Sequence, residues 1–167
     1  RLGGTVAYSA LTARALGMKA GIVTAVGKET PLNALDGIPI TSIESPHSTT
    51  FENIYTDAGR AQYLRAQAAR VDLDTVPPLW RNASIIHLAP IANEIDSSLP
   101  NDFSPALLGV TPQGWMRHWD SSGRVSRSEW SDSESVLHKA NAVVISREDV
   151  NGDHELIEQM AHQTRML

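Results

Sequence analysis

The 167-residue chain contains no cysteine, and only 5% of its residues are aromatic. The missing cysteine excludes disulfide bonds, thiolate nucleophiles and cysteine-based zinc sites. No run of about 18 apolar residues occurs, so we expect no membrane-spanning segment and no membrane partner. Lysine and arginine form no cluster in the sequence and the formal net charge is −5, so we expect no nucleic-acid partner. The composition therefore fits a cytoplasmic protein, and the length of the chain fits about one domain.

Several common catalytic motifs are also missing. The sequence has no G-x-S-x-G nucleophile elbow, no H-E-x-x-H zinc motif, no Walker A loop and no G-x-G-x-x-G dinucleotide fingerprint. Function therefore has to be inferred from the order of the secondary-structure elements and from the polar residues at their ends.

The hydrophobic pattern alternates between helices and buried strands. Small and apolar residues at helical spacing predict a helix over 3–17, and a nearly continuous apolar strand follows over 19–26. Helices that alternate with apolar strands are typical of an α/β domain with a mostly parallel, Rossmann-like sheet flanked by helices. We expect further strands over 38–44, 84–88, 106–111, 125–130 and 142–146, and helices over 133–140 and 153–164.

One β-rich segment interrupts this alternation. Two β-prone runs, 49–55 and 60–66, flank an Asp-Ala-Gly turn signal at 57–59. We therefore predict a β-hairpin, within a small β insertion at about 38–66 of a single domain over 1–167. In open parallel sheets, ligands bind beyond the carboxyl ends of the strands, so residues that follow the predicted strands are the candidate site residues.

The first candidates are Gly3 and Gly4, which open the first predicted helix. Glycines at a helix N-terminus allow backbone N–H groups to meet a hydroxyl or an anion without a Cβ in the way. An ordinary N-terminal helix turn explains the two glycines equally well.

The predicted hairpin carries Asn53, Tyr63 and Arg65. Alternation along a strand places Tyr63 and Arg65 on the same face. A tyrosine ring for packing beside a guanidinium fork suits the recognition of a polyol, whose hydroxyl oxygens the fork can bind. A solvent-exposed sheet face is the alternative.

Gln113 and Arg117 follow the strand predicted over 106–111, with Trp115 between them. Two polar side chains at the carboxyl end of a strand indicate a binding segment. A surface loop held by a packing tryptophan is the alternative.

Ser146, Glu148 and Asp149 follow the strand predicted over 142–146. A carboxylate just beyond a strand is a usual place to hold Mg²⁺ or its waters near a phosphate. Alternatively, Ser146 caps the next helix and Glu148 or Asp149 complements its dipole. The two interpretations are compatible.

Taken in order, these segments resemble the ribokinase-like, or PfkB, family of carbohydrate and nucleoside kinases. The two initial glycines, the alanine-rich helix and GIVTAVG at 21–27 resemble that family's N-terminal segment. TTFENIYTDAGR at 49–60 resembles its lid hairpin. The sequence Ser-Arg-Glu-Asp at 146–149 falls on the family's N-x-x-E motif, with serine in place of asparagine and aspartate in place of glutamate.

The resemblance implies an α/β, ribokinase-like fold, ATP as phosphoryl donor and Mg²⁺ as cofactor. It implies that Gly3 and Gly4 contact substrate hydroxyls and that the hairpin closes over the substrate. It further implies a substrate-side role for Asn53, Tyr63, Arg65, Gln113 and Arg117, and a metal or phosphate role for Ser146, Glu148 and Asp149. The segment over 113–123 is similar to inositol kinases of the family, so myo-inositol is one candidate substrate among sugars and nucleosides.

The resemblance also implies that the chain is truncated. An opening strand would precede Arg1, and the G-A-G-D motif with the catalytic-base aspartate would follow Leu167. We therefore assign no catalytic residue within the chain and expect the fragment alone to be inactive. The full-length protein would transfer the γ-phosphate of ATP to a hydroxyl of a small carbohydrate, inositol or nucleoside.

Two other functions fit the same residues. One is a non-catalytic α/β module that binds a sugar or nucleotide; the other is an unrelated Rossmann-like domain whose glycines only cap a helix. The edge of a lid can pair with the same edge of a second copy, which allows a homodimer. The kinase interpretation requires that Gly3, Gly4, Arg65, Arg117 and the acidic pair at 148–149 border one crevice.

Overall fold

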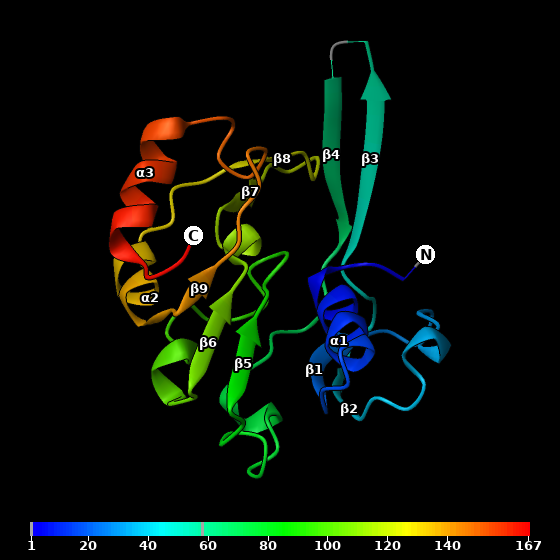
Figure 1. The fold of residues 1–167 in the computed structure, drawn as a ribbon. Helices are drawn as coiled ribbons and strands as arrows, with labels where there is room; N and C mark the ends of the chain where they lie inside the picture. The colour runs from blue at the N-terminus through cyan, green and yellow to red at the C-terminus, as the bar shows by residue number, and fades with distance from the viewer. Residues whose placement is uncertain (1, 58) are drawn as a thin grey trace.

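The computed structural model describes residues 2–57 and 59–167, so Ala58 of the predicted hairpin turn lies outside the described residues. The N-terminal part is a helix packed on two parallel strands (Figure 1). α1 (Thr5–Ala15) precedes β1 (Ile22–Val26), and β2 (Ile40–Glu44) pairs with β1 in parallel. This part has its own small core, made by Ala7, Ala10, Ile22, Leu35 and Ile38. The predicted helix and both predicted strands are confirmed.

The central sheet is parallel and has the order β5-β6-β9. Its strands are β5 (Ile85–Leu88), β6 (Leu107–Val110) and β9 (Ala142–Val143). Two helices, α2 (Ser133–Lys139) and α3 (His154–Gln163), lie on one side of this sheet (Figure 1). The larger core joins the sheet to these helices, with Leu108, Val110 and Val143 from the strands and Val136, Leu137 and Met160 from the helices. These elements confirm the predicted α/β class.

The strands of this sheet are less buried than their apolar sequences predict. Ile85 is 47% exposed, Leu107 is 39% exposed, and Val144, in the strand predicted over 142–146, is 65% exposed. Side chains alternate between the faces of a sheet, and these three lie opposite the face that packs on the helical core. β9 also ends at Val143, three residues before the predicted end of the strand at 146.

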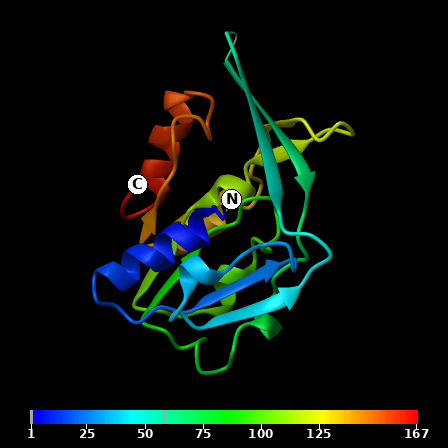
Figure 2. The same ribbon diagram turned by 90° about the vertical axis from the view of Figure 1, so that its right-hand side faces the viewer.

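Two antiparallel hairpins complete the fold. β3 (Thr50–Thr56) and β4 (Gly59–Ala66) form the predicted hairpin, which projects from the body of the molecule (Figures 1 and 2). β7 (Arg117–Trp119) and β8 (Val125–Arg127) form a smaller hairpin, of which the sequence predicted only the second strand. β2 pairs with β1 and not with the projecting hairpin.

The small hairpin joins the large one to the body. A β-bridge connects Tyr63 of β4 to Arg124, and the backbone N–H of Leu64 donates to the carbonyl of Gly123 at 2.8 Å. None of the helices in the described ranges is both long and apolar enough to cross a bilayer. The fold thus places two hairpins above the edge of the sheet where the strands end.

Candidate functional site

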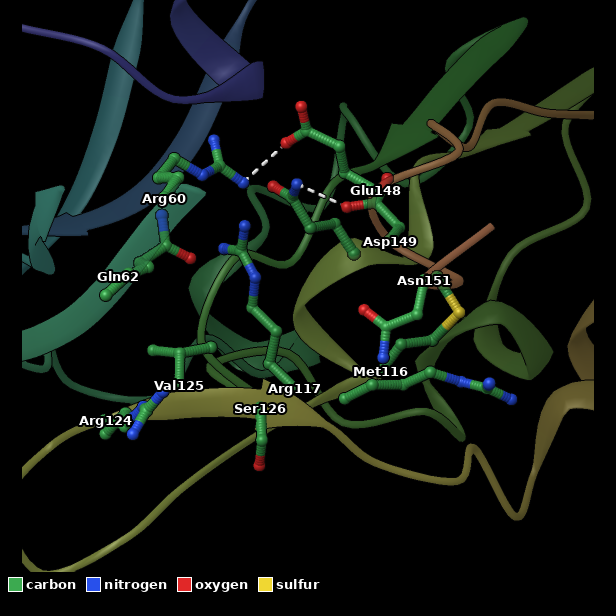
Figure 3. A pocket seen from close by; sticks show the side chains of 13 residues that line it. Arg60, Gln62, Met116, Arg117, Arg124, Val125, Ser126, Glu148, Asp149 and Asn151 are labelled. Carbon is green, nitrogen blue, oxygen red and sulfur yellow. Dashed lines mark hydrogen bonds and ion pairs between the residues drawn. The ribbon is translucent and has the colours of Figure 1, made fainter. Parts of the chain in front are cut away.

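A cavity of about 180 Å³ lies where the projecting hairpin meets the carboxyl edge of the sheet (Figure 3). Strand β4 contributes Arg60, Ala61 and Gln62 to its lining. The segment after β6 and the small hairpin contribute Gln113, Met116, Arg117, Arg124, Val125, Ser126 and Arg127. The segment after β9 contributes Glu148, Asp149 and Asn151.

Arg117 reaches into this cavity from the start of β7 (Figure 3). Its Nη1 donates to the carbonyl of Ile91 at 2.9 Å, and its Cζ lies 4.9 Å from the centre of the Phe51 ring. Burial lowers the pKa of Arg117, and the nearby Asp149 carboxylate opposes that shift. The guanidinium is therefore held in place by a carbonyl and an aromatic ring, while part of its donor fork faces the cavity.

Asp149 ties together the segments that follow β6 and β9. Its Oδ2 accepts hydrogen bonds from the backbone N–H and the hydroxyl of Ser146, both at 2.8 Å, and its Oδ1 accepts one from Gln113 Nε2 at 2.7 Å. These contacts fix the turn from Ser146 to Asp149 and hold Gln113 against the wall of the cavity. No helix begins at this turn, because α3 starts at His154 and Asp153 is its N-cap, so the capping interpretation is wrong.

Glu148 contacts the projecting hairpin directly. Its Oε2 lies 2.6 Å from Nη2 of Arg60 on β4 (Figure 3). This ion pair connects the hairpin to the segment after β9 across the cavity.

Gly3 and Gly4 do not line the cavity. Gly4 is the N-cap of α1, with φ at +86°, a conformation that glycine adopts without a steric penalty. A Cβ built on Gly4 would lie 3.9 Å from Cδ1 of Ile91, the residue whose carbonyl accepts from Arg117. Ile91 therefore lies between the N-terminus of α1 and Arg117.

The hairpin residues divide between two faces. Asn53 pairs with Gln62, which lines the cavity, and Gln62 Nε2 donates to Asn53 Oδ1 at 3.0 Å. Tyr63 and Arg65 lie on the opposite face, as alternation from Gln62 requires. There the Arg65 Cζ stacks 4.7 Å from the Tyr63 ring.

Arg65 also pairs with Glu52, at 2.6 Å between Nη2 and Oε2. The structure thus brings Gln113, Arg117, Glu148 and Asp149 together around one cavity but does not bring Tyr63 and Arg65 to it. The expected single crevice is therefore wrong in part: Arg117, Glu148 and Asp149 border the cavity, whereas Gly3, Gly4 and Arg65 do not line it. A contact of Tyr63 or Arg65 with substrate stays a prediction.

The sequence analysis singled out four of the residues that line the cavity and missed the others, among them Arg60, Gln62 and Arg124. Arg60 and Gln62 alternate with Tyr63 and Arg65, so the sequence defines two polar faces of the strand but not the one that turns inward. Arg124 follows the turn of the small hairpin, whose first strand carried no predictive pattern.

The carboxylates around the cavity are the candidate ligands of the expected Mg²⁺. Within residues 2–57 and 59–167, no group of three or more histidine, aspartate or glutamate side chains could hold a metal ion. Mg²⁺ is commonly bound by one or two carboxylates together with the phosphates of a ligand. Both oxygens of Asp149 already accept hydrogen bonds and Glu148 is paired with Arg60, so a metal role for Ser146, Glu148 and Asp149 stays a prediction.

No protein-family model matches the sequence, and no curated protein matches it either. Solved structures do match. A sulfate complex of a pyrophosphate-dependent kinase in the ribokinase family has a TM-score of 0.76 at 18% identity, over 97% of this chain. A pyrophosphate-dependent kinase of that family, complexed with a pyrophosphate analog and myo-inositol, has a TM-score of 0.75 at 19% identity, also over 97%. The chain has a ribokinase-like fold.

A third ribokinase-like structure agrees over the whole chain. It is a pyrophosphate-dependent myo-inositol-1 kinase converted into a myo-inositol-3 kinase, with a TM-score of 0.80 at 17% identity over 100% of this chain. The chain spans only 62%, 61% and 62% of the lengths of these three proteins. At these identities the similarity establishes the fold, and membership of the PfkB family stays a prediction.

Proposed function

We propose that the full-length protein is a phosphotransferase that phosphorylates a hydroxyl of a small polyol. One observation supports this most strongly: a projecting hairpin and the carboxyl ends of parallel strands enclose one polar cavity, within a fold that the inositol kinases described above share. In such sheets this edge is where ligands bind.

The size of the cavity favours a small acceptor. Its volume of about 180 Å³ is below the roughly 300–1,000 Å³ typical of pockets for drug-sized ligands. A cyclitol or an open-chain polyol fits this space better than a nucleoside does. We therefore put myo-inositol and similar polyols ahead of nucleosides as acceptors.

We assign the binding of the acceptor to residues of the cavity and its rim. Asn53, Gln62 and Gln113 offer amide donors and acceptors to hydroxyl groups, and Arg117 offers a guanidinium fork. Gly3 and Gly4 would present backbone N–H groups from the start of α1. Tyr63 and Arg65 would contribute only from the outer face of the hairpin.

We propose ATP as the donor and Mg²⁺ as its cofactor, with pyrophosphate as the other donor to test because the neighbouring structures are pyrophosphate-dependent kinases. When bound, Mg²⁺ neutralises phosphate charge. Ser146, Glu148 and Asp149 would hold the metal or its waters. We place the catalytic-base aspartate beyond Leu167, so the residues described here bind and orient the acceptor.

The test uses the full-length protein with myo-inositol, sorbitol, hexoses and nucleosides, each with Mg²⁺ and either ATP or pyrophosphate. A ligand of the native state raises the melting temperature, and product formation reports transfer. Gln113→Ala should reduce the shift given by a polyol, whereas Gln159→Ala on α3 should not. A shift without product from either donor would indicate a non-catalytic binding module. The absence of any shift would contradict the proposal.

A further inference from the structure

Phe51 lies on the face of the projecting hairpin that turns toward the cavity. On that face Asn53 is paired with Gln62, which lines the cavity. Side chains alternate between the two faces of a strand, so Phe51, two residues before Asn53, shares the same face. Phe51 itself is not among the residues that line the cavity. Any effect of its ring on a ligand confined to the cavity must therefore pass through another residue.

Arg117 is the cavity residue that the ring contacts. Its Cζ lies over the Phe51 ring, 4.9 Å from the ring centre. A guanidinium within about 6 Å of an aromatic ring centre, over the face of the ring, is attracted by the ring quadrupole, and the attraction grows as water is removed from the pair. Both side chains are half-buried, so this contact is stronger than one between two fully exposed groups.

Two contacts restrain the guanidinium of Arg117. In the part of the chain that the structure describes, the group makes one hydrogen bond, from Nη1 to the carbonyl of Ile91 at 2.9 Å. A single hydrogen bond fixes one nitrogen but leaves the rest of the planar group free to swing about it. The contact with Phe51 adds a second point of restraint, at Cζ. The two contacts together hold the orientation of the donor fork.

The main chain of Arg117 is fixed without the ring. Arg117 pairs with Arg127 in the small hairpin, and its carbonyl accepts a hydrogen bond from Asn93 Nδ2 at 3.0 Å. The ring therefore acts on the long side chain, which has several rotatable bonds and loses conformational freedom when it binds a ligand. A guanidinium already held in one orientation offers its fork of donors to a ligand at a lower entropic cost.

We propose that Phe51 is a positioning residue of the acceptor site: its ring holds the Arg117 guanidinium in the orientation that binds an acceptor hydroxyl. The inference rests on the proposed function and adds to it a residue outside the cavity lining. Phe51 belongs to the projecting hairpin and Arg117 to the small hairpin, so the orientation of the cavity arginine depends on how the two hairpins pack. The acceptor site is complete only while they are packed together.

The experiment separates the aromatic ring from its apolar bulk. Phe51→Leu keeps an apolar side chain but removes the ring, whereas Phe51→Tyr keeps the ring. Each variant of the full-length protein is titrated calorimetrically with myo-inositol and with sorbitol. For the polyol that binds the wild type, we expect Phe51→Leu to weaken binding about three- to tenfold and Phe51→Tyr to stay within about twofold of the wild type.

A double-mutant cycle shows whether the ring acts through Arg117. Arg117→Gln alone should weaken polyol binding, and adding Phe51→Leu should cause no further loss, because the group that the ring positions is then absent. Ile54→Ala is the control for a general loosening of the hairpin. Ile54 lies on the opposite face of the same strand and is 40% exposed, so its loss should leave the affinity unchanged.

Each outcome decides the question. Unchanged affinity in Phe51→Leu would overturn the inference while the proposed function stands. Additive losses in the double variant, or equal losses in Phe51→Tyr and Phe51→Leu, would show that the ring does not act by holding Arg117 and would also overturn it. If Phe51→Leu lowers the melting temperature, the double variant still decides, because a loss caused by unfolding adds to that of Arg117→Gln. If neither polyol binds the wild type, the proposed function itself fails, and the inference with it.

Discussion

Arg60 of the projecting hairpin and Glu148 of the segment after β9 form an ion pair of 2.6 Å across the mouth of the cavity. Their side chains are 37% and 71% exposed, so solvent screens the pair and it contributes only about 0–1 kcal/mol to the free energy of unfolding. The pair nevertheless joins two parts of the fold that are far apart in sequence. Its effect should therefore appear in the motion of the hairpin rather than in global stability.

Arg60→Gln should increase amide hydrogen exchange along β3 and β4 and change the melting temperature by less than about 4 °C. The loss of the ion pair removes one of the contacts that hold the hairpin to the body, whereas the bridge between Tyr63 and Arg124 and the core remain. Lys28→Gln is the matched control, because it breaks the exposed ion pair of Lys28 with Glu44, outside the cavity. Unchanged exchange of the hairpin amides in Arg60→Gln would show that this contact does not restrain the hairpin.

Arg117 lines the cavity, whereas Arg65 lies on the outer face of the projecting hairpin. Variants of these two residues should show which surface binds the acceptor. Arg117→Gln removes a guanidinium from the cavity and should lower the affinity for the polyol acceptor at least tenfold. Arg65→Ala removes a group already paired with Glu52 on the outer face, so we expect a loss of less than about threefold, with no loss of folding. Calorimetric titration gives both affinities. An equal loss in the two variants would place part of the binding surface on the outer face.

Much of this fold follows from local sequence pattern. Amphipathic spacing and short apolar runs predicted α1, β1, β5, β6 and α3. Apolar residues recur at the helical period where one face of a helix is buried, and they form a short run where a strand is buried. The cavity was harder to predict. Gln113 and Asp149 were predicted because they follow strands. Arg60 and Arg124 line the cavity only because the two hairpins pack against each other. That docking depends on tertiary contacts between residues distant in sequence, which no local pattern encodes.

One of those docking contacts requires a glycine. Gly123 has φ at +84°, its carbonyl accepts from the N–H of Leu64 at 2.8 Å, and a Cβ on it would collide with the carbonyl oxygen of Leu64. Gly123→Ala should therefore cost about 1–2 kcal/mol for the left-handed backbone and a further ~1–3 kcal/mol for the collision. Urea unfolding measures both.

Gly37→Ala provides the control. Gly37 has φ at +83°, but no atom lies within 4 Å of the position of its Cβ, so only the backbone cost applies. Equal destabilisation by Gly37→Ala and Gly123→Ala would contradict the docking contact between Gly123 and β4.

The first turn of α3 should make stability depend on pH. The backbone N–H of Leu156 donates to Asp153 Oδ1 at 3.1 Å, and Arg127 lies 3.3 Å from Oδ2; the first contact, reinforced by the second, lowers the pKa of Asp153. The aspartate has an ordinary pKa of about 3.9 in the unfolded chain, so its stabilisation is complete above that pH and is lost as the pH falls through the lower folded value.

Asp153→Asn keeps an oxygen for the helix cap but removes the charge, whereas Asp153→Ala removes both. At pH 7 we expect the melting temperature to fall in the order wild type, Asn, Ala, with roughly 2–4 °C between wild type and Ala. Because only the wild-type side chain takes up a proton in acid, the gap between wild type and Asn should close below about pH 4. The gap between Asn and Ala should remain constant from pH 7 to pH 3. A wild-type advantage over Asn that persists unchanged at pH 3 would show that the charge of Asp153 does not stabilise α3.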